Sequence, residues 1–282
     1  MIITLGVLIF VLGLCFGSFV NMLEYRLARK YKLISKSKFL ISNNKRSFCD
    51  GCGKKLGFFE NIPVLSWLIQ KGRTKCCNKK LPLSYPIVEL LMGILFFLFF
   101  LFKIFPNLNS GFVFVIPGLD FFSLQMTIEL LVYLIIIVCL VFSAVFDLKY
   151  MILPDISTGI LVGCAVFLMV LGRHGGLPVQ NLLSALVAFG FLGSIYLLTK
   201  GKGMGFGDVK YVIFMGLFLG CQKTILAFYV AFIVGAIVGI FLMVLKKANR
   251  KSQIPFGPFL ILGTFLAWFL GDIIIKFLIS NF

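Results

Sequence analysis

Acidic residues and histidine are scarce in this sequence of 282 residues. It contains 10 Asp and Glu against 27 Lys and Arg, and a single histidine, His174. His174 lies in a glycine-containing turn, where it is interpreted as a plain loop residue. With no other histidine, and no Ser–Lys pair beyond what chance gives, hydrolases that use Ser/His, Cys/His or Ser/Lys pairs find no support. A carboxylate pair remains as the candidate for hydrolytic chemistry.

Apolar residues are abundant and occur in long runs. Hydrophobic residues make up 60% of the chain, with 34 Phe, and the mean hydropathy is +1.07. Runs of about 17 to 25 apolar residues recur, which is the length needed to cross a bilayer. The sequence therefore predicts an all-α polytopic membrane protein with about eight transmembrane helices. They are expected at 2–23, 85–103, 124–146, 156–172, 181–199, 209–221, 223–245 and 256–280.

Seven or nine spans are the alternatives to eight. The segment 104–123 is itself rather apolar, and the span 209–221 is short. The first span lacks a positively charged start and is followed by basic residues, so it is interpreted as a retained anchor rather than a cleaved signal peptide.

The distribution of charge predicts the orientation. If the N-terminus is outside, 23 of the 27 Lys and Arg fall in inner segments. This asymmetry follows the positive-inside rule and puts Asp147 and Asp208 at the cytoplasmic ends of their spans. The net charge of +17 is therefore attributed to topology and to attraction for anionic lipid headgroups, and no nucleic-acid partner is expected. The predicted divisions are a first transmembrane helix (1–23), a cytoplasmic basic domain (24–84) and a transmembrane core (85–282).

Four cysteines in the basic domain predict a metal site. Cys49 and Cys52 form a Cys-x-x-Cys pair, and Cys76 and Cys77 are adjacent. Cytoplasmic thiols stay reduced, so a structural zinc site is favoured over two disulfides. Vicinal cysteines do not easily place both sulfurs on one tetrahedral ion, so Cys76 is the last ligand expected. The alternative is a loop with spare thiols.

The stretch Gly203–Lys210 places a carboxylate, Asp208, in a glycine-rich bend at the start of a span. A carboxylate beside hydrocarbon is costly and predicts a functional site. Gly205 and Gly207 allow close backbone approach or positive φ, although a flexible turn would also explain them. Lys210 is a supporting candidate whose alternative is a side chain that extends to the interface.

A second carboxylate, Asp147, ends the span at 124–146. A helix C-terminus is unfavourable for a negative charge, which favours a special role. Asp155 follows Pro154 at the head of the next helix, where it either caps that helix or supports the site. We expect Asp147 and Asp208 to form one site in which they share a proton, with Asp208 as base and Asp147 as acid.

These motifs, taken in order, resemble the type IV prepilin peptidases, membrane aspartyl proteases with a Gly-x-Gly-Asp signature. The opening motif is similar to Gly17–Asn21 with Arg26, and the last motif is similar to Ile254–Phe259. The family motifs that lie between the first and the last are matched in order by the two cysteine pairs, Leu83–Glu89, Asp147 with Pro154 and Asp155, and Gly203–Lys210.

The resemblance implies an enzyme of the bacterial cytoplasmic membrane that removes the basic leader of prepilin or pseudopilin substrates of pilus and secretion systems. Proteolysis would need no cofactor. It also implies N-methylation of the new N-terminus with S-adenosylmethionine, associated with the cysteine-containing region. The family spacing expects cysteine at position 74, where this chain has Thr74.

Three points stay open at this stage. Glu24 and Glu89 could contact a basic leader or the new ammonium group, or simply face the interface. An ion-coupled transporter or channel also uses intramembrane acids, but it needs them near the bilayer midplane, and no internal repeat is present. The third alternative is an inactive scaffold or a methyltransferase alone.

Overall fold

The structure is a computed structural model, and it describes residues 2–33, 48–49, 52–104, 121–172, 178–201, 203–247 and 254–281. His174 and most of the segment 104–123 lie outside the described residues. Contacts divide the chain into two compact units, Met1–Gly118 and Leu119–Phe282. The boundaries predicted near residues 23 and 84 are of another kind, because they separate membrane-spanning segments from the cytoplasmic segment. They stay predictions.

The predicted all-helical membrane architecture is confirmed. Six helices are apolar and long enough to cross a membrane: Thr4–Lys30, Ser84–Phe102, Thr127–Tyr150, Pro178–Leu198, Phe206–Val244 and Gly257–Ser280. A seventh, Asp155–Val170, is apolar but shorter. The 39-residue helix Phe206–Val244 bends at Gly220, whose φ of 73° is not helical, so it corresponds to two predicted spans. Within the described ranges there is no β-strand, and the only β-pairing consists of the isolated bridges Phe48–Lys55 and Arg73–Lys80.

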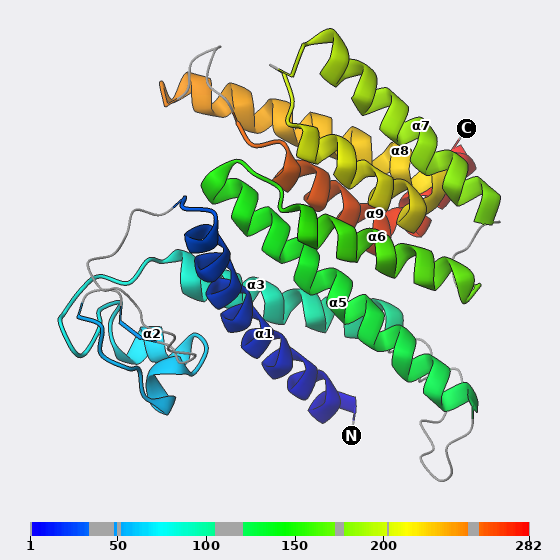
Figure 1. Cartoon of the computed structure of the whole chain (residues 1–282). Coiled ribbons are helices and arrows are strands. Elements are labelled where there is room, and N and C mark those ends of the chain that lie inside the picture. Colours follow the sequence, from blue (N-terminus) through cyan, green and yellow to red (C-terminus); the bar gives the residue numbers. More distant parts are fainter. Residues whose placement is uncertain are drawn as a thin grey trace. The chain divides into compact units, whose positions relative to one another are not determined.

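The first unit is organised by two antiparallel helices, α1 (Ile2–Lys30) and α3 (Ser84–Phe99), which lie side by side (Figure 1). Glycines make their close approach possible. A Cβ at Gly13 would come within 2.8 Å of the Cα of Gly93, and a Cβ at Gly17 within 2.5 Å of the Cα of Glu89. Small residues of this kind let membrane helices pack backbone to backbone.

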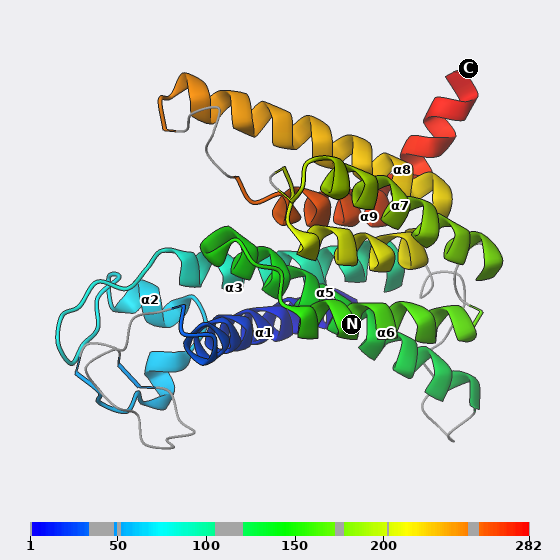
Figure 2. The ribbon, with the colours of Figure 1, turned by 45° about the horizontal axis from the view of Figure 1, so that its top comes forward.

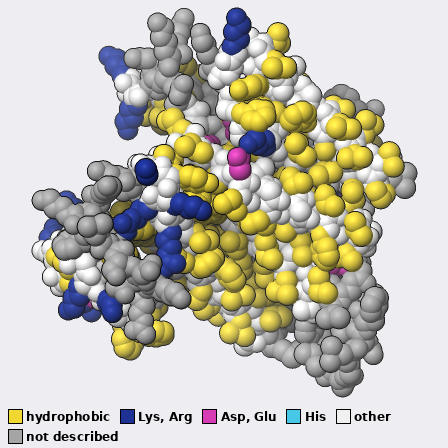
Figure 3. Space-filling model, viewed as in Figure 1, with side chains coloured by type: hydrophobic (Ala, Val, Ile, Leu, Met, Phe, Trp, Pro, Cys, Tyr) yellow, Lys and Arg dark blue, Asp and Glu magenta, His cyan; other side chains and the backbone are white. Residues whose placement is uncertain are grey.

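The insert between α1 and α3 carries the cysteines. It contains the short helices η1 (Phe58–Asn61) and α2 (Leu65–Ile69). Outside the insert, α3 is followed directly by the π-helical turn η2 (Phe100–Ile104). Figure 3 shows Lys and Arg side chains gathered over the insert, whereas hydrophobic side chains cover much of the visible helical surface. The contrast agrees with an insert in water and helices in lipid.

The second unit comprises α5 (Phe121–Tyr150), α6 (Asp155–Val170), α7 (Pro178–Leu198), α8 (Phe206–Val244) and α9 (Gly257–Asn281). Helix α8 contacts α6, α7 and α9, and Figures 1 and 2 show it among them. Its Tyr211, Phe214 and Met215 are fully buried in the core. This packing places the first turn of α8 inside the unit.

Candidate active site

Asp208 lies in the first turn of α8 and is buried, with 6% of its surface exposed. The preceding Gly205 is the N-cap residue of the helix. The Asp208 N–H donates to the Gly205 carbonyl at 3.2 Å, and the Gly205 N–H donates to the Asp208 carboxylate. The side chain is therefore fixed by half of a capping box, at the helix end that favours negative charge.

Asp147 lies near the end of α5 and is also buried, at 5% exposure. Its carboxylate accepts the backbone N–H of Gly257, the first residue of α9, while its Oδ2 is completely buried without a hydrogen-bond partner. The unfavourable α5 C-terminus is thus offset by the favourable N-terminus of α9. The reason given above for assigning the acid to Asp147 no longer holds.

The two carboxyl groups lie close enough to interact electrostatically, although they belong to helices α5 and α8. Two glycines permit this arrangement. A Cβ at Gly257 would lie 2.6 Å from Asp147 Oδ2, and one at Gly207 would lie 3.0 Å from the Cβ of Leu153. A side chain at either position would push on the aspartate or on the turn that follows it.

Gly205 differs from these two glycines. Its φ is −73°, and a Cβ there would make only an ordinary contact, 3.5 Å from Asp208 Oδ2. The structure therefore requires no positive φ at this position. Its described role is the backbone N–H that it donates to Asp208.

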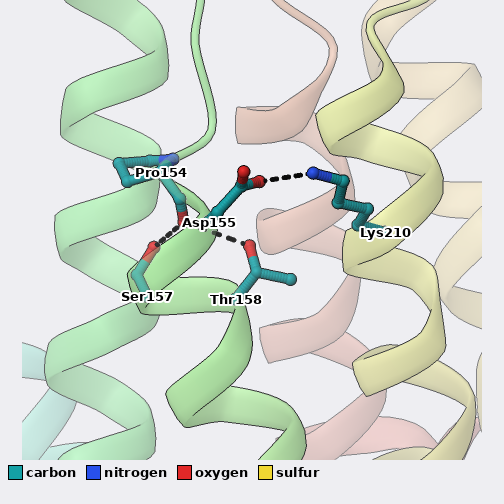
Figure 4. Close-up of polar contacts among 5 residues, drawn as sticks. All are labelled: Pro154, Asp155, Ser157, Thr158 and Lys210. Carbon is teal, nitrogen blue, oxygen red and sulfur yellow. Dashed lines mark hydrogen bonds and ion pairs between the residues drawn. The ribbon is translucent and has the colours of Figure 1, made fainter.

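Asp155 and Lys210 connect α6 to α8 through an ion pair of 2.7 Å between Asp155 Oδ1 and Lys210 Nζ (Figure 4). Lys210 also lies over the ring of Phe206, 5.1 Å from its centroid. The N-cap of α6 is Pro154, and no side-chain cap is present, so Asp155 faces its partner on α8 instead of capping. The chain turn is held further because Ser157 and Thr158 donate to the Pro154 carbonyl (Figure 4).

Sequence reasoning did not name Gly257 or Leu153 as site residues. The signal was present, because Gly257 lies within the motif Ile254–Phe259 that resembles the last motif of the family. What the sequence did not reveal is that the start of α9 approaches the end of α5. That contact depends on how the helices pack.

The four cysteines of the insert converge, including the vicinal pair. Their Sγ atoms all lie within 4.8 Å of one another. Individual separations are 3.6 Å for Cys49–Cys77, 3.2 Å for Cys52–Cys76 and 4.0 Å for Cys76–Cys77. Four thiolates about 2.3 Å from a tetrahedral zinc ion lie about 3.8 Å from each other, so the cluster fits that ion.

The backbone explains how a vicinal pair can join the cluster. The turn that begins at Cys49 is repeated at Thr74: their N–H groups donate to Lys54 O at 2.8 Å and to Lys79 O at 2.9 Å. Thr74 therefore occupies the place of a first knuckle ligand, and Cys77 that of the second. Cys76 comes from inside the turn and supplies the fourth sulfur.

Thr74 keeps a contact with the cluster. Its Oγ1 accepts the Lys79 N–H at 3.0 Å and lies 3.2 Å from Cys77 Sγ. With the accepting side used by Lys79, the hydroxyl hydrogen is available to the sulfur. Hydrogen bonds with Cys52 and Cys49 raise the pKa of the Cys76 thiol to about 12, so the protonated thiol is favoured. A bound metal ion would lower this pKa, because it stabilises the thiolate.

Glu24 and Glu89 do not face the interface. They are 3% and 8% exposed, in α1 and α3 respectively. Glu89 accepts the backbone N–H of Val64 at 2.7 Å, which attaches the insert to α3. The interpretation of these residues as plain interface-facing side chains is wrong.

Together the helices and the buried pair define a class: a polytopic membrane protein in which two helices bring aspartates into one site. Sequence comparisons identify the family. The Type IV leader peptidase family matches residues 134–240, and the Bacterial Peptidase A24 N-terminal domain matches residues 11–103.

Proteins named prepilin leader peptidase/N-methyltransferase are similar along nearly the whole chain. The protein from Aeromonas hydrophila is 30% identical, covering 98% of this chain and 94% of its own length. The protein from Bacillus subtilis (strain 168) is 29% identical, covering 97% of each, and that from Legionella pneumophila is 30% identical, covering 83% of this chain and 76% of its own. No solved structure is significantly similar.

The chain therefore belongs to the type IV leader peptidase family. It is an integral membrane enzyme with a peptidase domain, and the resemblance found in its motifs is confirmed. Family membership decides against the transporter or channel alternative.

Proposed function

We propose that the chain is an aspartyl endopeptidase that cleaves the basic leader of type IV prepilin-like substrates, with Asp147 and Asp208 as its catalytic residues. The observation that carries this proposal is the pair itself: two buried carboxyl groups from different helices, close enough for their charges to interact. A buried like-charged pair is stable only if it shares a proton, which is the state that aspartyl chemistry requires.

The division of labour follows from the shared proton. The ionised member takes a proton from a water molecule, and the oxygen attacks the scissile carbonyl carbon. The protonated member donates to the carbonyl oxygen, and the collapse of the tetrahedral intermediate breaks the C–N bond as the amine takes up a proton. Asp147 Oδ2, buried and unpartnered, is the oxygen best placed to hold the shared proton or the water. Asp208 lies at the N-terminus of α8 and Asp147 accepts the N–H of the first residue of α9, so both carboxylates meet a helix N-terminus and we assign the roles to the pair jointly.

Four residues support the pair in this proposal. Gly205 fixes Asp208 through its N–H, and Gly207 leaves room for Leu153 beneath the Asp147 turn. Asp155 and Lys210 hold the start of α6 against the start of α8. Each acts on position, and none is assigned to the bond-breaking step.

The position of the two aspartates along their helices supports this substrate. Asp147 is near the end of α5 and Asp208 near the start of α8, so both lie at one membrane boundary. The positive-inside distribution supports assigning this boundary to the cytoplasmic face of the bacterial inner membrane, with the N-terminus outside. A prepilin or pseudopilin presents its cleavage site there, with the basic leader in water and the apolar helix in lipid.

The first unit is assigned to N-methylation of the new N-terminus, as the names of the relatives suggest. S-adenosylmethionine would supply the methyl group. In the insert, Cys49, Cys52, Cys76 and Cys77 are proposed to hold a structural zinc ion, which would fix the two turns against each other. No cofactor is assigned to proteolysis.

Incubation of the purified protein with a prepilin tests the peptidase. We expect Asp147→Asn and Asp208→Asn each to abolish cleavage, because neither an amide nor a lone carboxylate can share the proton. Asp272→Asn is the matched control. Asp272 lies on α9, far from the two aspartates in sequence, and its Oδ1 pairs with Lys223 Nζ at 2.8 Å. Cleavage that persists in either active-site variant would contradict the proposal.

A further inference from the structure

A second group of buried polar side chains belongs to the first unit, whereas the two aspartates belong to the second. Asn21 and Glu24 on α1 and Glu89 on α3 are 7%, 3% and 8% exposed. All three present oxygen acceptors, and all lie at the end of the α1–α3 pair that adjoins the insert. Buried acceptors in a membrane helix pair require donors.

Asn21 has an unsatisfied acceptor. Its Nδ2 donates to the Tyr85 carbonyl at 3.1 Å, which fixes the amide orientation, and its Oδ1 is buried without any hydrogen-bond partner. A buried acceptor of this kind is uncommon and marks a position where a donor from outside the chain can bind.

Glu89 accepts hydrogen bonds but has no cationic partner among the described residues. It accepts the Val64 N–H at 2.7 Å and the Ser18 hydroxyl, and no Lys or Arg of the described chain pairs with it. Val64, a β-branched residue, adopts φ 60° and ψ −52° at this contact. The chain thus holds an unfavourable backbone conformation where its N–H meets the carboxylate.

The helix register brings Asn21 and Glu89 to one place. Gly17 lies against the Cα of Glu89, and Asn21 bonds to the carbonyl of Tyr85. Because both pairs are four residues apart on antiparallel helices, the two side chains are separated by about one helical turn, roughly 5.4 Å along the interface. Glu24 follows one turn further along α1.

We propose that Asn21 Oδ1 and Glu89 bind a primary ammonium group, the N-terminal amine of the processed substrate. The free acceptor Asn21 Oδ1 and the Glu89 carboxylate, which no Lys or Arg of the described chain neutralises, favour a cationic ligand with hydrogen-bond donors, and an ammonium group has three N–H donors and a positive charge. This inference rests on the proposed function, in which cleavage leaves a new amine at the head of an apolar helix. The same chemistry occurs in the phosphatidylethanolamine headgroup, so the test must distinguish the two sources.

Binding measured without cleavage provides the test. The full chain carrying Asp147→Asn and Asp208→Asn is placed in phosphatidylcholine nanodiscs with a peptide of the mature prepilin N-terminus. We expect the free-amine peptide to bind about tenfold more tightly than its N-acetylated form, a difference of one charge-assisted contact. Glu89→Gln and Asn21→Leu should each bring this ratio close to one.

Two further variants keep the test decisive. Glu60→Gln makes the same chemical change as Glu89→Gln at a half-buried residue of η1 whose side chain accepts the Gly57 N–H, so the ratio should stay at its original value. Asn21→Asp retains the acceptor oxygen and should keep the preference even if Asn21→Leu does not fold. Equal binding of both peptides by the unaltered site, or a preference that survives Glu89→Gln, would overturn the proposal.

The lipid source is tested by repeating the measurement with phosphatidylethanolamine in the discs. We expect the preference for the free-amine peptide to persist. A preference that disappears in these discs would assign the site to the lipid headgroup and overturn the substrate assignment. Because this experiment measures binding and not cleavage, neither result bears on the roles of Asp147 and Asp208. Conversely, cleavage by the Asn variants would contradict the proposed peptidase roles without changing the measured preference for the free amine.

Discussion

At the residue scale, the space beside the carboxylates distinguishes glycines that look alike in the sequence. A Cβ at Gly257 would lie 2.6 Å from Asp147 Oδ2, whereas a Cβ at Gly205 would lie 3.5 Å from Asp208 Oδ2. The first separation is impossible without movement, and the second is ordinary contact. Gly257 is therefore the glycine on which the position of Asp147 depends.

We predict that Gly257→Ala lowers the cleavage rate by about 100-fold, because a displacement of about 1 Å in a catalytic group has effects of that size. Gly159→Ala on α6 is the control, since a Cβ there meets nothing within 4 Å. Cleavage kinetics of both variants, with thermal unfolding as a check on folding, provide the measurement. Equal rates for the two variants would show that Asp147 tolerates the methyl group.

The cysteine cluster supports a second prediction at this scale. Because Thr74 stands where the first ligand of the second turn belongs, Cys76→Ser should weaken zinc binding by at least about tenfold, and adding Thr74→Cys should restore it. Competition with a chelator measures both affinities. Failure of Thr74→Cys to restore binding would contradict the equivalence of the two turns, and Cys139→Ser on α5 is the control for loss of a thiol.

At the element scale, the starts of α6 and α8 are connected by side chains that are close in space but 55 positions apart in sequence. Hydropathy predicted each helix, and the break between two spans near residue 222 corresponds to the bend at Gly220. The pairing of Asp155 with Lys210 and the contact of Asp147 with Gly257 could not be predicted. Periodicity and composition describe one helix at a time, whereas these contacts depend on packing between helices.

Exchange of the Asp155–Lys210 pair tests whether this connection positions the site. The side chains are 71% and 36% exposed, so the pair should contribute only ~0.2–1 kcal/mol to stability. We predict that Asp155→Lys lowers the cleavage rate about tenfold with little change in Tm, and that Lys210→Asp in the same chain restores much of it. The exchange of Lys223 and Asp272, an ion pair between α8 and α9, is the matched control. A Tm that falls in parallel with the rate would indicate a purely structural pair.

At the scale of the whole molecule, membrane topology connects the proposed chemistry to its substrate. Charge, hydropathy and short motifs were sufficient to predict the helical class and the cysteine-containing insert, because each depends on local composition or on one motif. The catalytic role of the two aspartates stays a prediction. The number of crossings depends also on α6, which has only 16 residues, and on the bend in α8. A length of 16 residues gives about 24 Å of helix, slightly less than the hydrocarbon thickness of about 30 Å.

The location of the C-terminus decides the number of crossings. Eight crossings from an outer N-terminus return Phe282 to the outside, whereas seven or nine leave it in the cytoplasm. We therefore predict that alkaline phosphatase fused after Phe282 is active and that green fluorescent protein at the same position is dark. The control is the opposite pattern for fusions after Lys200, between α7 and α8 on the side of Asp208. A fluorescent fusion at Phe282 would mean that α6 or one half of α8 does not cross the membrane, or that the segment 104–123 does. Failure of α6 alone would place Asp147 and Asp208 on opposite faces, which their electrostatic interaction within one unit forbids, so the difference would have to lie in α8 or in 104–123.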